Sequence, residues 1–134
     1  MFMLDTNIVS YALRNRPPLV LERLRATPPE DVCISVVTLA ELRFGASKSA
    51  KAAHYHGLID TFTGWVQALA FDSAAASTYG DVRTRLEVLG TPIGPLDTII
   101  AAHALSLDAV LVTNNGEEFA RVDGLAIEDW TEAP

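Results

Sequence analysis

Three acidic residues are spaced so that a fold could bring them to one metal ion. Asp5 ends the apolar stretch 2–4, Glu41 follows the apolar stretch 32–35, and Asp97 opens a later apolar segment. Clustered carboxylates repel one another, and one must hold a proton unless a cation joins them. A hard divalent ion such as Mg²⁺ or Mn²⁺ takes oxygen ligands and supplies that charge. The corresponding chemistry is metal-assisted hydrolysis of a phosphodiester.

Each of these residues also has a purely structural interpretation. Asp5 is a good N-cap for a following helix, and Thr38 with Glu41 matches a capping box. Asp97 in a first helical turn benefits from the helix dipole, and Asn115 before a glycine is a common turn residue. Taken singly, each residue favours the structural interpretation, and only their combination favours a metal site.

The residues that could position these acids form short apolar strands alternating with helices. The strands are expected at 2–4, 32–35, 68–71, 109–113 and 125–127, and the helices at 8–13, 19–25, 38–46, 50–66, 73–89, 96–107 and 116–121. Alternation of this kind predicts βαβ units, and uninterrupted apolar strands are typical of parallel sheets covered on both faces. The sequence therefore predicts an α/β fold, a three-layer α/β/α sandwich around a mostly parallel five-stranded sheet. Ligands in such sheets bind at the carboxyl ends of the strands.

Length and composition exclude several other classes of protein. A chain of 134 residues predicts a single domain over 1–134. Its 49% hydrophobic and 20% charged residues exclude general disorder. The longest uncharged stretch, residues 61–71, is too short for a membrane helix. Cys33 is the only cysteine, which excludes an internal disulfide and a thiolate metal cluster and favours a reducing cytoplasm.

The charge is uneven along the chain. The net charge of −7 argues against a general nucleic-acid coating protein. Residues 1–51 nevertheless hold seven of the ten Lys and Arg residues against five acids. This third of the chain could carry an anion-attracting surface, although arginines on solvated helix faces are the simpler explanation.

Three other functions of α/β proteins fit this sequence less well. A two-component receiver domain needs a lysine after a late strand, whereas the only lysines are Lys48 and Lys51. A phosphatase with an aspartyl nucleophile would have a second acid at the position of Asn7. Dinucleotide binding would need a glycine-rich loop after the first strand, and residues 6–8 contain no glycine.

Four motifs in this order resemble the PIN-domain ribonucleases, and specifically the VapC toxins of bacterial type II toxin–antitoxin pairs. They occupy residues 4–10, 37–46, 92–104 and 111–130. The resemblance implies that Asp5, Glu41 and Asp97 form the catalytic, metal-binding triad. It implies Asp5 and Asp97 as direct ligands of Mg²⁺ or Mn²⁺, with Glu41 acting through water.

The resemblance also suggests residues around the triad. Many members of the family have a fourth acid after the fourth strand, where this chain has Asn115 with Glu118 nearby. The candidates for the fourth position or for supporting the triad are Thr6, Asn7, Thr113, Asn115 and Glu118. Because asparagine brings no charge, binding of a second metal ion stays open.

The function implied is a metal-dependent endoribonuclease that cuts RNA, with tRNA as a candidate substrate, in the cytoplasm and is neutralised by a VapB-type antitoxin. The family also implies a homodimer. Arg14, Arg16 and Arg43 are candidates for contact with RNA phosphates. Candidates for antitoxin contact are Tyr11, Leu13 and Phe44. The alternative is a catalytically inactive PIN-like module that binds RNA or protein.

Overall fold

Five short strands form one sheet at the centre of the protein. The computed structural model describes residues 1–133. Its strands are β1 (Phe2–Leu4), β2 (Val32–Ser35), β3 (Gln67–Leu69), β4 (Val110–Val112) and β5 (Ile127–Glu128). Their order across the sheet is β3-β2-β1-β4-β5, and every pair is parallel. The expected five-stranded sheet is confirmed, and it is entirely rather than mostly parallel.

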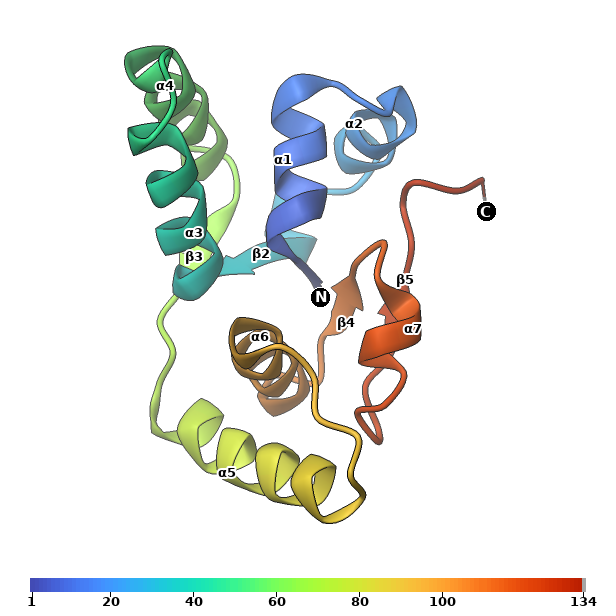
Figure 1. Ribbon diagram of the computed structural model, residues 1–134. Helices are drawn as coiled ribbons and strands as arrows, with labels where there is room; N and C mark the ends of the chain where they lie inside the picture. Colours follow the sequence, from blue (N-terminus) through green and yellow to red (C-terminus); the bar gives the residue numbers. More distant parts are fainter. Residues whose placement is uncertain (134) are drawn as a thin grey trace.

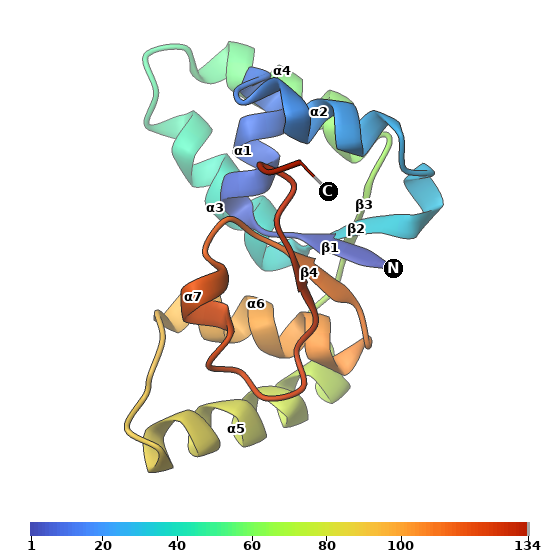
Figure 2. The ribbon, with the colours of Figure 1, turned by 90° about the vertical axis from the view of Figure 1, so that its right-hand side faces the viewer.

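Helices cover both faces of the sheet, which gives the three layers predicted. The helices are α1 (Thr6–Arg14), α2 (Pro18–Arg25), α3 (Val36–Ser47), α4 (Ala52–Thr63), α5 (Ser73–Val88), α6 (Pro95–Ser106), α7 (Gly116–Phe119) and the 3₁₀ turn η1 (Pro29–Asp31). Figure 1 and Figure 2 show α1 to α4 on one side of the sheet and α5 and α6 on the other. Within residues 1–133, no helix has the length and apolar character needed to span a membrane.

The strands are apolar because they are buried on both faces. Met3 and Leu4 of β1 are at most 1% exposed and belong to two different clusters of buried side chains. One cluster joins β1 to α1–α4, and the other joins it to α5–α7. Strands β2 and β4 likewise contribute to both clusters, so the two halves of the core meet on the three central strands.

The position of β1 also determines where a ligand can bind. The chain proceeds from β1 to β2 and β3 on one side, and then returns to place β4 and β5 on the other. The strand order therefore reverses at β1, and the crevice beyond its carboxyl end is the place where open parallel sheets bind ligands. Asp5 is the first residue beyond that end.

Helix α3 begins earlier than its sequence suggested. Ser35 is its N-cap, and the Ser35 hydroxyl accepts a hydrogen bond from the Val37 N–H at 3.1 Å. Thr38 is fully buried inside the first turn. The interpretation of Thr38 and Glu41 as a capping box is therefore wrong, because a serine three residues upstream already caps the helix.

Other boundaries differ from the prediction by a few residues. Helix α4 ends at Thr63, before Gly64, whose N–H bonds to the carbonyls of Asp60 and Thr61. The last strand starts at Ile127 rather than at residue 125, because Gly124 turns the chain with a φ of +82°.

Replacing Ser35 by alanine is expected to cost about 2 kcal/mol of stability. Besides capping α3, the Ser35 hydroxyl lies 2.8 Å from Nδ1 of His103, and both side chains are at most 1% exposed. The substitution removes the cap and leaves a buried ring nitrogen without its partner. Urea unfolding of Ser35→Ala measures the cost, with Ser77→Ala on the exposed face of α5 as the control. Equal midpoints for the two variants would contradict this account.

Candidate active site

Asp5 is fixed in place by the backbone of two neighbouring elements. Its N–H donates to the Val112 carbonyl of β4 at 3.0 Å, and its Oδ1 accepts the Ile8 N–H of α1 at 3.0 Å. The residue is only 7% exposed. Asp5 therefore is the helix cap that its sequence position suggested, and its carboxylate also lies at the reversal point of the sheet.

Burial raises the pKa of the Asp5 carboxyl. Hydrogen bonds from the Thr113 hydroxyl and the Ile8 N–H lower this pKa, and the charges of Glu41 and Asp129 raise it. The site thus holds a buried carboxylate with two donors on it and two further negative charges near it.

Glu41 reaches the site from α3. The Thr6 hydroxyl, on the first residue of α1, donates to Glu41 Oε1 at 2.7 Å. Thr6 and Asp5 are adjacent in the chain, so this bond holds the Glu41 carboxylate beside the Asp5 carboxylate. The charge of Glu41 contributes to raising the pKa of both Asp5 and Asp97.

Asp97 lies in the first turn of α6 and is paired with Glu118. The pKa of the Asp97 carboxyl is raised to about 6, first by burial and then by the charge and hydrogen bond of Glu118, with smaller effects of Asp5 and Glu41. A β-carbon added to Gly94 would lie 3.3 Å from Asp97 Oδ2 and 3.7 Å from Glu118 Oε1. A glycine at this position therefore leaves room for the two carboxylates.

The side chain that approaches Asp97 is the carboxylate of Glu118 and not the amide of Asn115. The Gly94 N–H donates to Glu118 Oε1 at 2.8 Å, and the Asn115 side-chain amide donates to Glu118 Oε2. The Asn115 N–H in turn bonds to the buried Thr113 hydroxyl at 3.0 Å. Asn115 thus acts on the site through Glu118, whose carboxylate supplies the charge that asparagine lacks.

Asp129 is an acid near the site to which sequence reasoning gave no role. It follows β5 directly, and its Oδ1 accepts the Thr131 N–H at 2.8 Å and the Thr131 hydroxyl at 2.6 Å. Its charge raises the pKa of Asp5. The available signal was its position, since an acid directly after a parallel strand lies at the same edge of the sheet as Asp5.

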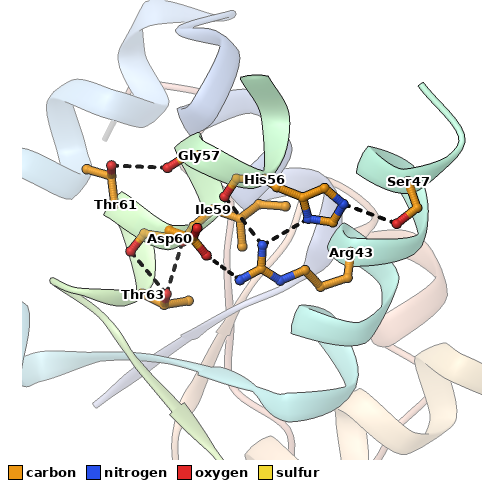
Figure 3. Close-up of polar contacts among 8 residues, drawn as sticks. All are labelled: Arg43, Ser47, His56, Gly57, Ile59, Asp60, Thr61 and Thr63. Atoms are coloured by element: carbon orange, nitrogen blue, oxygen red, sulfur yellow. Dashed lines mark hydrogen bonds and ion pairs between the residues drawn. The ribbon is translucent and has the colours of Figure 1, made fainter. Parts of the chain in front are cut away.

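The remaining candidates lie away from the carboxylates. Asn7 is exposed in the first turn of α1. Arg14 and Arg16 are exposed at the other end of that helix and beyond it. Arg43 points between α3 and α4, where it pairs with Asp60 and donates to His56 Nδ1 at 3.0 Å (Figure 3). The guanidinium of Arg43 therefore already has a carboxylate partner.

The donor set fits a hard divalent cation in its chemistry. Across residues 1–133, no three side chains of His, Cys, Asp or Glu form a closed metal-binding group. Asp5, Glu41, Asp97 and Glu118 nevertheless perturb one another electrostatically, and all their donor atoms are carboxylate oxygens. Such a set suits Mg²⁺ or Mn²⁺, whose charge would offset the repulsion.

Comparison with known proteins gives consistent matches over nearly the whole chain. Residues 2–125 match the PIN domain. The tRNA(fMet)-specific endonuclease VapC of Shigella flexneri is 44% identical over 130 residues, covering 97% of this chain and 98% of that protein. The crystal structure of VapBC2 from Rickettsia felis bound to promoter DNA matches with a TM-score of 0.89 at 37% identity, over 96% of this chain and 98% of that one. The crystal structure of DNA-bound VapBC from Salmonella typhimurium matches with a TM-score of 0.91 at 41% identity, over 96% of this chain and 97% of that one.

Replacing Asp97 by asparagine is expected to stabilise the metal-free protein at neutral pH. Because the folded pKa of about 6 exceeds the ordinary 3.8, the folded state binds this proton more tightly than the unfolded state. The resulting stabilisation is complete below the ordinary pKa and is lost as the pH rises through 6. In EDTA at pH 7, Asp97→Asn should gain on the order of 1 kcal/mol after solvent screening, or about 4 °C in Tm.

The same comparison at acidic pH is the control for this prediction. Near pH 3, below the ordinary pKa of 3.8, the wild-type carboxyl is protonated in both the folded and the unfolded state, so the two proteins should melt together. Asp81→Asn, on the exposed face of α5, should show no such pH-dependent difference. A Tm difference between Asp97→Asn and wild type that is equal at both pH values would contradict the raised pKa of Asp97.

Proposed function

This chain belongs to the PIN domain family, and we propose that it is the VapC-type toxin of a type II toxin–antitoxin pair, a metal-dependent endoribonuclease. The observation that carries the proposal is the gathering of Asp5, Glu41 and Asp97 at the point where the strand order reverses. An inactive module would have no use for carboxylates that repel one another and cost stability. The proposed place of action is the cytoplasm.

We assign the metal-binding role to Asp5, Glu41 and Asp97, the acids whose charges affect the pKa values of Asp5 and Asp97. A bound Mg²⁺ or Mn²⁺ ion would activate water and neutralise the charge that develops on the phosphate. Asp5 and Asp97 are the proposed direct ligands, and Glu41, held by Thr6, is the third acid. Glu118 takes the fourth position, with Asn115 orienting it.

The proposed substrate is RNA, with tRNA as the class to test first. The relative in Shigella flexneri is named as specific for tRNA(fMet) and is 44% identical to this chain along almost its full length. Hydrolysis of a phosphodiester bond needs the ligand chemistry described above and no covalent intermediate on the protein. A tRNA substrate is therefore compatible with the site.

We propose that a VapB-type antitoxin docks on an apolar groove of about 620 Å³ between α2 and α4. The groove is lined mainly by apolar side chains: Leu13, Leu21, Leu24, Leu58, Phe62 and Trp65. Trp65 is 71% exposed, and large exposed apolar surface of this kind marks protein contacts. Leu13 fits the contact surface expected from the sequence, and Phe44 lies on α3 with 66% exposure.

The homodimer stays a prediction.

RNA cleavage is expected to require both a divalent cation and the charge of Asp97. Purified protein should cut tRNA with Mg²⁺ or Mn²⁺ and should be inactive in EDTA. Asp97→Asn keeps the size of the side chain but should reduce the rate by at least about a hundredfold. Asp81→Asn should cleave at the wild-type rate. Wild-type activity in EDTA, or in Asp97→Asn, would contradict the proposal.

Truncating Trp65 is expected to weaken antitoxin binding and to leave cleavage unchanged. Trp65→Ala removes an exposed aromatic anchor from the apolar groove and should raise the Kd for the antitoxin at least about tenfold. Leu89→Ala, an exposed apolar residue after α5, is the matched control. Titration calorimetry with the neighbouring gene product and a tRNA cleavage assay measure the two effects. Unchanged antitoxin affinity in Trp65→Ala would exclude this groove.

A further inference from the structure

A second groove, of about 590 Å³, lies beside the apolar one, between α1 and α4. Its polar and aromatic lining residues are Tyr11, Arg14, Arg16, His54 and Tyr55. In the part of the chain that the structure describes, no carboxylate lines this groove, although the whole protein has a net charge of −7. The groove therefore concentrates positive charge on an acidic protein, which favours an anionic ligand.

The cations and aromatic rings of the groove are placed together. The Arg14 guanidinium lies 6.0 Å from the centre of the Tyr11 ring, and its Nε–H donates to the Ser10 carbonyl at 3.3 Å. The His54 ring meets the Tyr55 ring edge to face, with 5.2 Å between their centres. Cations combined with half-buried aromatic rings are the means by which proteins bind single-stranded nucleic acid, since bases stack on the rings and phosphates meet the cations.

Helix α1 links the groove to the carboxylate site, because Asp5 caps its start and Tyr11 and Arg14 line the groove near its end. Asp5 caps the start of this helix, Tyr11 lies about 9 Å further along its axis and Arg14 about 13 Å. The Tyr11 hydroxyl accepts a hydrogen bond from the Asn114 side chain at 2.9 Å. Asn114 is flanked by Thr113 and Asn115, whose side chains contact Asp5 and Glu118. Tyr11, at one side of the groove, is thus joined by a hydrogen bond to the segment that also contacts the site carboxylates.

We propose that this groove binds the single-stranded stretch of RNA that flanks the phosphate to be cut. Bases stack on the rings of Tyr11 and Tyr55, and phosphates contact Arg14 and Arg16. The proposal rests on the proposed function and adds the path of the substrate to it. Arg43 is not part of this path, because it is paired with Asp60 between α3 and α4 (Figure 3).

A protein segment is the less favoured occupant. The neighbouring groove is lined mainly by apolar side chains, as an antitoxin contact requires, whereas this one carries two arginines and a histidine. Leu13 and Leu58 line both grooves and separate them. An antitoxin on the apolar side would therefore border the RNA path.

Binding of a short unstructured oligoribonucleotide in EDTA, followed by fluorescence anisotropy, tests the groove without cleavage. Arg14→Ala and Arg16→Ala should each weaken binding several-fold and reduce the slope of log Kd against log salt by about 0.7. Arg83→Ala on α5 is the control and should leave affinity and slope unchanged. Failure of the wild type to bind, or wild-type affinity and slope in both groove variants, would overturn the proposal.

A pair of substitutions at Tyr55 tests stacking. Tyr55→Phe keeps the ring and should bind as wild type, whereas Tyr55→Leu keeps apolar bulk without a ring and should lose about tenfold in affinity. Thermal melts of both variants show whether the fold is kept. Equal RNA affinities of folded Leu and Phe variants would remove stacking at Tyr55 from the proposal.

Cleavage and antitoxin assays on the same variants separate the possible failures. With Mg²⁺, the arginine variants should raise KM for RNA and keep kcat. If the wild type cuts no RNA at all, the proposed function fails, whatever the binding result. If the wild type cuts RNA but the groove variants lose only antitoxin affinity, the groove is a protein-binding surface and this inference alone is wrong.

Discussion

Repulsion among carboxylates at one edge of a parallel sheet is the force that the surrounding structure must counter. Three acids of the site, Asp5, Glu41 and Glu118, accept hydrogen bonds that keep them in place. The Ile8 N–H and the Thr113 hydroxyl donate hydrogen bonds to Asp5, and the Thr6 hydroxyl donates one to Glu41. Glu118 is held by the Gly94 N–H and by Asn115. These donors come from three separate stretches of the chain, residues 6–8, 94 and 113–115, so the charged edge needs α1, the start of α6 and the segment after β4 to be brought together.

The sequence predicted the fold, and with it the placement of Asp5, Glu41 and Asp97 at one edge of the sheet. Strand β1 had to be apolar throughout, since it is buried on both faces, and that pattern located Asp5 at its end. The order of strands and helices then indicated that Glu41 and Asp97 come to the same edge. At Asp5, helix capping and the proposed chemistry favour the same residue type.

Other features depended on side-chain geometry that no sequence pattern carries. The choice between Asn115 and Glu118 depends on how one short helix, α7, is oriented toward Gly94. Arg43 is basic and lies two residues after Glu41, yet it pairs with Asp60 across a helix pair. The position of Asp129 after the last strand indicated the edge on which it lies, but its nearness to Asp5 depends on the pairing of β5 with β4, which only the fold shows.

The central place of β1 has a consequence for how the protein is made. Its residues are translated well before β4, so its ladder with β4 and the bond from Asp5 to Val112 form only after residues 110–112 have been made. Asp97 and Glu118 also belong to the last third of the chain. A nascent chain therefore carries no assembled nuclease site while most of it is being synthesised. Nuclease activity would therefore appear only after the segment with Asp97 and Glu118 has been translated and folded.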